Sequence, residues 1–253
     1  MIEAKDLTKG FNSHLVLRRL DLDVRRGETL VIIGRSGCGK SVLLKHIIGL
    51  VKPDAGSLKV DGREIADMSV KELNALRLRF GMLFQDGALF SSLTVAQNVA
   101  TPLIEHADVP PDLLGPLVRL RIALAGLPVE AATKMPSELS GGMRKRAAVA
   151  RALALEPEVL FLDEPTSGLD PITARAFDRL LRFLCDDLGL TILVVTHDLD
   201  TLLGIVDRAI VLAGGKVIAD GPVKDVMHVD DPWLQSYFRV RTMLEGAENN
   251  RGT

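Results

Sequence analysis

The stretch LVIIGRSGCGKS, residues 30–41, decides the fold of this chain. Its four apolar residues predict a buried strand, a helix is predicted over Lys40–Leu50, and a glycine-rich loop joins the two. In this context the pattern G-x-x-x-x-G-K-S indicates a phosphate-binding loop, because glycines let backbone N–H groups surround a phosphate where side chains would collide. Lys40 would place its charge on the β- and γ-phosphates, and Ser41 would offer a hydroxyl ligand to Mg²⁺. The residues predicted to hold the nucleotide here are Gly34, Arg35, Ser36, Gly37, Cys38, Gly39, Lys40 and Ser41.

Two further strand-like runs end in polar residues. Val159–Leu162 is followed by Asp163 and Glu164, and Thr191–Val195 is followed, one residue on, by His197. The carboxyl ends of parallel strands share one edge of a sheet, where ligands bind. There Asp163 would hold Mg²⁺ through its water shell, Glu164 would orient or deprotonate the attacking water, and His197 would hydrogen-bond the γ-phosphate. Taken alone, the two acids have a second interpretation as a solvated strand end, and a lone histidine at a strand end is more often a structural residue.

The spacing of these runs predicts an α/β fold. Apolar strands separated by helical stretches indicate a mostly parallel sheet with helices on both faces. Together with the phosphate-binding loop, this pattern predicts a P-loop NTPase (RecA-like) core. The stretches Ile2–Val24 and Ser57–Gly62 predict an antiparallel β layer near the nucleotide, and Arg208–Asp220 predicts two more short strands. A helix after Pro171 should bury one face. That face consists of Phe177, Leu180, Leu181, Leu184 and Leu188.

Strand patterns are missing from about residue 93 to 155, which predicts a helical subdomain inserted into the core. The predicted boundaries are 1–92 for the first part of the ATP-binding core, 93–155 for the helical subdomain, 156–240 for the second part of the core with a C-terminal segment, and 241–253 for a flexible tail.

The composition narrows the functional classes. A net charge of −2 over 253 residues argues against a dedicated nucleic-acid surface. Two cysteines without metal-ligand spacing fit a reducing compartment. The longest apolar runs have strand length and fall short of the roughly 18 residues needed to cross a bilayer. If the protein acts at a membrane, other chains are expected to supply the spans.

A second glycine-containing segment distinguishes the chain from other nucleotide-binding proteins. Leu139–Met143 reads LSGGM and precedes an alanine-rich helix predicted over Arg144–Leu155. A serine and two glycines that open a helix form another anion site with exposed N–H groups. One copy has no use for two γ-phosphate sites on separate subdomains. Two copies facing head to tail do, because each could close Ser140, Gly141 and Gly142 on its partner's nucleotide, which predicts a homodimer with ATP at the interface.

These motifs, in this order and spacing over roughly residues 2–222, resemble the ATP-binding subunits of ABC transporters. The resemblance implies Mg²⁺-dependent ATP hydrolysis coupled to transport. It assigns Gln85 to the Q-loop, whose glutamine touches Mg²⁺ and links the core to the helical subdomain, and so makes it a catalytic and metal-binding candidate. It also assigns Phe11 to the aromatic position that stacks on adenine, although an ordinary core aromatic is the alternative.

The resemblance gives Ser167–Asp170 the role of the D-loop, which crosses the dimer interface and makes Asp170 a nucleotide-site candidate. Asp170 before Pro171 is also a favourable helix N-cap, and both roles can hold together. Met143 departs from the glutamine usual in the family, so it carries over no chemical role.

Gly81–Val95, GMLFQDGALFSSLTV, and the methionine in the signature resemble the ATPases of MCE-type (Mla-like) phospholipid transport systems. This resemblance implies a transmembrane permease, an MCE-type lipid-binding protein and a peripheral place on the cytoplasmic face of a bacterial inner membrane. Two alternatives remain open. One is the ATPase subunit of an importer for amino acids or another polar solute, and the other is a soluble ABC ATPase that acts on DNA or ribosomes.

Two segments are candidates for contacts with other subunits. Ala88–Phe90 should belong to a groove for a coupling helix of the permease, or else pack internally. Pro232–Phe238 holds the only tryptophan and the only tyrosine of the chain, which suggests an anchor on a neighbouring subunit. A helix folded back on its own domain is the alternative.

Overall fold

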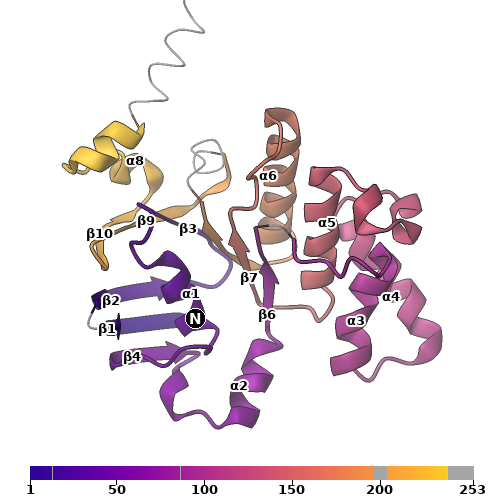
Figure 1. Cartoon of the computed structure of the whole chain (residues 1–253), viewed down its shortest axis with the longest axis horizontal. Helices are drawn as coiled ribbons and strands as arrows, with labels where there is room; N and C mark the ends of the chain where they lie inside the picture. The colour runs from indigo at the N-terminus through magenta and orange to yellow at the C-terminus, as the bar shows by residue number, and fades with distance from the viewer. Residues whose placement is uncertain (13, 86, 197–203, 239–253) are drawn as a thin grey trace, which may run out of the picture.

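The computed structural model of the protein, which describes residues 1–12, 14–85, 87–196 and 204–238, has two β-sheets with helices packed on them (Figure 1). The larger sheet contains β3 (Thr29–Gly34), β6 (Phe80–Leu83), β7 (Val159–Asp163), β8 (Thr191–Val195), β9 (Arg208–Ala213) and β10 (Lys216–Gly221). Its order is β10-β9-β3-β8-β7-β6, with β10 antiparallel to β9 and the other neighbours parallel. The predicted α/β class and mostly parallel sheet are confirmed.

The parallel strands are buried on both faces, which explains why they read as continuous apolar runs. Within β3, Val31 and Ile33 pack in one core with the helices, whereas Leu30 and Ile32 pack in a second core with the smaller sheet. Because successive side chains point to opposite faces, one six-residue strand serves both cores.

The smaller sheet is the predicted antiparallel layer. It has the order β2-β1-β4-β5 and packs, together with α1, in the second core. Its strands and the adjoining helix are β1 (Ile2–Phe11), β2 (His14–Val24), β4 (Ala55–Val60), β5 (Arg63–Glu64) and α1 (Lys40–Ile47).

Three helices lie together to the right of the larger sheet in Figure 1. Besides α1, the described residues include the helices α2 (Val70–Arg77), α3 (Val95–His106), α4 (Pro111–Leu124), α5 (Gly141–Ala152), α6 (Pro171–Asp186) and α8 (Val223–Val226), and the short 3₁₀ turns η1 (Ile65–Asp67), η2 (Val129–Thr133) and η3 (Pro136–Glu138). Helices α3, α4 and α5 form the right-hand group, and their apolar faces join the first core. Helix α5 begins at Gly141 rather than at the predicted Arg144, because Ser140 caps it.

The predicted apolar face of α6 is correct except at its end. Phe177, Leu180, Leu181 and Leu184 are buried, but Leu188 is 46% exposed. The helix ends at Asp186 and the chain turns through Gly189 at φ 67°, so Leu188 lies beyond the helical period.

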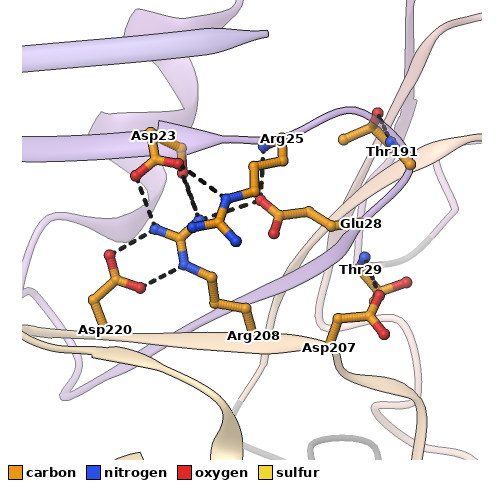
Figure 2. A network of polar contacts seen from close by, with 9 residues as sticks. Asp23, Arg25, Glu28, Thr29, Thr191, Asp207, Arg208 and Asp220 are labelled. Atoms are coloured by element: carbon orange, nitrogen blue, oxygen red, sulfur yellow. Dashed lines mark hydrogen bonds and ion pairs between the residues drawn. The ribbon is translucent and has the colours of Figure 1, made fainter.

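A buried arginine joins the two sheets (Figure 2). Arg208 on β9 donates from Nε and Nη2 to the two carboxylate oxygens of Asp220 on β10, both at 2.6 Å. Its Nη2 also lies 3.1 Å from Oδ1 of Asp23 at the end of β2, and its Nη1 lies 3.3 Å from Oε1 of Glu28. The hydrogen bonds to Asp220, opposed by burial and supported by the charges of Asp220 and Asp23, raise the pKa of Arg208. The guanidinium thus fixes the antiparallel layer against the edge of the larger sheet.

The C-terminal aromatic segment packs on its own domain. Residues 232–238 are helical, with Leu234 and Phe238 buried in the first core and the Trp233 and Tyr237 rings stacked at 5.1 Å between centroids. This segment therefore folds back on its own domain, and its role as an anchor on a neighbouring subunit stays a prediction. The tail predicted as flexible lies outside the described residues. In the described ranges, no helix combines the length and apolarity that crossing a membrane requires.

Candidate active site

The glycine-rich loop joins β3 to α1 as predicted. A Cβ on Gly34 would lie 2.3 Å from the carbonyl oxygen of Leu212 on the neighbouring β9, so only glycine fits there. Gly39 takes φ 108° immediately before α1. The ammonium of Lys40 lies over the loop and donates to the carbonyl oxygens of Gly34 at 2.6 Å and Arg35 at 3.1 Å. A cation beside a helix N-terminus and a glycine loop is an arrangement suited to a polyphosphate.

The antiparallel layer lies against this loop. A Cβ on Gly39 would be 2.8 Å from Cδ2 of Leu17, which is paired with Lys9 across β1 and β2. Phe11 follows two residues later on β1, is 45% exposed, and has the Nζ of Lys9 5.4 Å from its ring centroid. The alternative that Phe11 is a core aromatic is therefore wrong. Its ring is partly exposed on the layer that flanks the phosphate loop.

Two predicted magnesium ligands come together. Ser41 on α1 and Asp163 at the end of β7 line one cavity of about 100 Å³, whose other walls are mostly apolar. Burial, followed by the nearby charge of Glu164, raises the pKa of Asp163, and Lys40 opposes this shift. A hydroxyl and a desolvated carboxylate fit Mg²⁺, because this ion prefers oxygen ligands and its charge would stabilise the ionised acid. Bound there by Ser41 and Asp163, Mg²⁺ would neutralise charge on the phosphates.

Gln85 lies elsewhere. It is exposed in the turn after β6 and lines a second cavity, of about 400 Å³, with Gly141, Ser167 and Gly168. The Q-loop, signature and D-loop segments of one chain thus meet at this second cavity. The structure does not place Gln85 on the cavity of Ser41 and Asp163, and its metal-binding role stays a prediction.

Glu164 has an unusual backbone conformation. Its φ is 48°, in the left-handed region that non-glycine residues rarely adopt. Its N–H donates to the carbonyl of Val195 on β8 at 2.8 Å, and its Oε2 accepts a 3.1 Å hydrogen bond from the hydroxyl of Thr196. Its carbonyl oxygen accepts a 3.0 Å hydrogen bond from Nζ of Lys145 on α5. His197, the third predicted catalytic residue, lies outside the described residues.

The signature segment forms the N-terminus of α5. Ser140 accepts from the N–H of Met143 through its hydroxyl, at 3.3 Å, and from the N–H of Arg144 through its carbonyl, at 2.9 Å. The N–H groups of Gly141 and Gly142 come first in the helix and have no place in its internal ladder. Ser140 thus caps the N-terminus of α5, and its anion-binding role stays a prediction.

Gly142 and Asp170 also have structural roles within the chain. A Cβ on Gly142 would lie 2.4 Å from Cγ2 of Thr173, so glycine is needed for the close approach of α5 to α6. Asp170 caps α6 by accepting from the N–H groups of Ile172 at 3.1 Å and Thr173 at 3.0 Å. The N-cap role predicted for Asp170 is confirmed, and hydrogen bonds from Thr173, through its side chain first and then its N–H, lower the pKa of Asp170.

The sequence interpretation gave no role to Thr196 or Lys145. The hydroxyl next to a predicted catalytic histidine carried no distinguishing pattern. Lys145 did carry a usable signal, since it shares a helical face with Gly142 and Val149, which are both buried. A lysine on a buried face needs a polar partner, and that partner is Glu164.

Fold and site together define a P-loop nucleoside triphosphatase with a second glycine segment that opens a helix in the same chain. The ABC transporter family matches residues 17–167, and the chain belongs to this family. It is an ATPase subunit of a transporter and binds ATP with Mg²⁺. It is 42% identical over 249 residues to MlaF of Haemophilus influenzae, the ATP-binding protein of an intermembrane phospholipid transport system, covering 98% of this chain and 92% of that one.

Other relatives differ in the cargo that their names state. A Mycobacterium leprae protein, mkl, named for ribonucleotide transport, is 40% identical, and the match covers 95% of this chain and 69% of mkl.

Among solved structures, cbiO1 from Clostridium perfringens, part of the complex cbiONQ, has a TM-score of 0.85 at 32% identity over 98% of both chains. The dimeric cassette MJ0796 bound to ADP and Pi has a TM-score of 0.78 at 32% identity, covering 88% of this chain and 99% of that one.

Proposed function

We propose that this chain dimerises around two MgATP and powers the transport of phospholipids or related lipids between envelope membranes through a separate permease. The observation that carries the lipid cargo is the 42% identity with MlaF across 98% of the chain. The methionine of the signature and the GALF stretch after Gln85 point the same way. The match covers 92% of the length of MlaF but 69% of the length of mkl. We therefore favour the phospholipid cargo named for MlaF over the ribonucleotide cargo named for mkl.

The geometry supports a composite ATP site. Ser41 and Asp163 line one cavity, whereas Gly141 and the D-loop residues Ser167 and Gly168 line another. Two anion-binding segments on different cavities of one chain can serve the same phosphate only if a second copy supplies one of them. In that dimer Glu164 would act on the attacking water, and Ser140 would close on the γ-phosphate held by the partner.

Phe90 offers a surface for the permease. The ring of Phe90 is 51% exposed, while its backbone N–H and carbonyl are both held by the amide side chain of buried Asn98, at 2.8 and 3.1 Å. Leu89, by contrast, packs against the first core. A fixed backbone that presents an exposed aromatic ring suits an anchor for a permease helix. On this proposal the subunit lies on the cytoplasmic face of the inner membrane, with an MCE-type protein in the same complex.

The test is affinity purification of the tagged chain from membranes, with the co-purifying chains identified. We expect a permease and an MCE-type protein, and a phospholipid transferred between labelled vesicles by the purified complex when ATP is added. Phe90→Ser should lose the permease while the isolated subunit keeps its ATPase activity. Co-purification of a permease with a polar-solute-binding protein would instead establish the importer, and salt-sensitive capture of DNA or ribosomes would establish a soluble ABC ATPase that acts on them.

A further inference from the structure

The signature helix reaches the predicted catalytic base of its own chain. Lys145 lies one turn beyond Gly141 on α5, is 6% exposed, and donates from Nζ to the carbonyl oxygen of Glu164 at 3.0 Å. A buried ammonium that donates to a backbone carbonyl holds that carbonyl firmly, since neither group can exchange its partner for water at low cost.

The Glu164 backbone needs such support. Its φ of 48° is disfavoured for a residue with a Cβ, so the conformation persists only where surrounding contacts fix it. Several contacts do so. Val195 at the end of β8 accepts from the N–H, and Thr196, the next residue, donates to the carboxylate. The carbonyl accepts from Lys145 on α5 at 3.0 Å and from the N–H of Ser167 in its own loop at 3.2 Å. Among these contacts, the one from Lys145 comes from the helix that carries the signature.

We propose that Lys145 is a positioning residue for ATP hydrolysis, which fixes the backbone of Glu164 so that its carboxylate meets the attacking water. One consequence of this role depends on the proposed function, because it requires the ATP-bound dimer. In the dimer, the helix that closes on the partner's nucleotide through Ser140 and Gly141 also holds the base of its own site, so docking of the signature and placement of the base are linked through one rigid helix.

The first test replaces Lys145 with methionine, which keeps the length and removes the donor. We expect kcat for ATP to fall at least tenfold, since small misplacements of a reacting group have effects of this size, with KM changed less than twofold. Lys145→Arg, which keeps N–H donors, should restore kcat to within about threefold of the wild type, and Lys145→Gln should lie between. Should the methionine variant not fold, the arginine and glutamine variants alone give the comparison.

Arg146→Met is the matched control. Arg146 is the next residue of α5 and donates to the carbonyls of Ala125 at 3.0 Å and Ala176 at 2.9 Å, which lie outside the candidate site. Its replacement should lower the melting temperature and leave kcat within twofold. A kcat for Lys145→Met within twofold of the wild type, or a loss equal to that of Arg146→Met, would overturn the proposal.

A double variant separates positioning from a general structural effect. If Lys145 acts through Glu164, then adding Lys145→Met to Glu164→Gln should leave the residual single-turnover rate unchanged, whereas independent effects would multiply. Multiplied losses would therefore reject the proposal. A different result would show that the composite site of the proposed function is wrong. In that case Glu164→Gln would form no ATP-dependent dimer, while Lys145→Met would still lower kcat.

Discussion

The hydroxyl of Thr196 lies 3.1 Å from Oε2 of Glu164 and donates a hydrogen bond to it. The two residues follow neighbouring parallel strands, in which Asp163 is paired with Val195. Thr196 is 1% exposed, so water does not replace this bond readily. The orientation of the carboxylate is therefore set by the adjacent strand as well as by its own loop.

Thr196→Val should slow hydrolysis without preventing ATP binding. Valine keeps the shape of threonine and removes the donor, and a hydrogen bond to a charged group contributes roughly 1.5–3 kcal/mol, or about a tenfold to hundredfold change in rate. Steady-state ATPase at saturating ATP measures the effect. Thr196→Ser, which keeps the hydroxyl, is the control, and equal rates for the valine and serine variants would show that the hydroxyl has no role.

Glu164→Gln should bind ATP and hydrolyse it at least a hundredfold more slowly, because an amide cannot accept the proton of the attacking water. The ATP-bound dimer should then persist on a sizing column in the presence of Mg²⁺. The wild type incubated with ADP provides the control and should elute as the monomer. Hydrolysis by the glutamine variant at the wild-type rate would remove Glu164 from the role of base.

Ser140→Arg should abolish ATPase activity while the monomer still binds ATP. A large side chain at the N-terminus of α5 would block the approach of the partner's γ-phosphate, whereas the phosphate loop of the same chain is untouched. Ser69→Arg is the control, since Ser69 also caps a helix, α2, with a 3.3 Å bond from the N–H of Glu72. Loss of a cap alone costs about 1 kcal/mol and should not affect activity. Activity of Ser140→Arg equal to that of Ser69→Arg would contradict the composite site.

The sequence predicted most reliably the features that depend on short-range pattern. The run Leu30–Ile33 and its glycine loop gave β3 and the start of α1, and Asp170 before Pro171 gave the cap of α6. Each of these follows from residues adjacent in the chain, where periodicity and capping preferences act.

Contacts between distant segments were not predictable in the same way. Nothing in the neighbourhood of Lys145 indicates that its ammonium reaches Glu164, 19 residues further along. The second role of Gly142 depends on Thr173, which α6 brings to it. Leu188 was wrongly predicted to be buried, because the helical period does not show where a helix ends. The chain leaves the helix before Leu188 and turns at Gly189. Such facts depend on how elements pack, which a single sequence leaves open.

The packing role of Gly142 can be separated from its predicted role in anion binding. Gly142→Ala should lower the free energy of unfolding by roughly 1–3 kcal/mol, because its methyl group overlaps Cγ2 of Thr173. Adding Thr173→Ser removes that methyl and should restore most of the stability, as measured by urea unfolding. Thr173→Ser alone is the control. If the double variant stays as unstable as Gly142→Ala, the overlap is not the cause.

A four-residue ion-pair network outside the active site makes stability depend on pH. Arg79 binds Glu158 through Nε at 2.5 Å and Nη2 at 2.8 Å, and Arg26 adds a third bond at 2.7 Å. Asp61 pairs with both arginines. The hydrogen bonds from Arg79, partly offset by desolvation, lower the pKa of Glu158 from 4.5 to about 2. The network joins the segments before β3, β6 and β7 to the end of β4.

Because the folded pKa of Glu158 is lower than the unfolded one, its contribution to stability is present above about pH 4.5 and is lost as the pH falls toward 2. Glu158→Gln should therefore unfold at a lower urea concentration than the wild type at pH 7, by about 1 kcal/mol given that the pair is more than a third exposed. The gap should narrow steadily between pH 4.5 and pH 2, and it should also shrink in 1 M salt, where a charge pair is screened. Glu105→Gln, at an exposed position on α3, should show neither change. A gap for Glu158→Gln that stays constant with pH would mean that packing of the side chain, rather than its charge, stabilises the network.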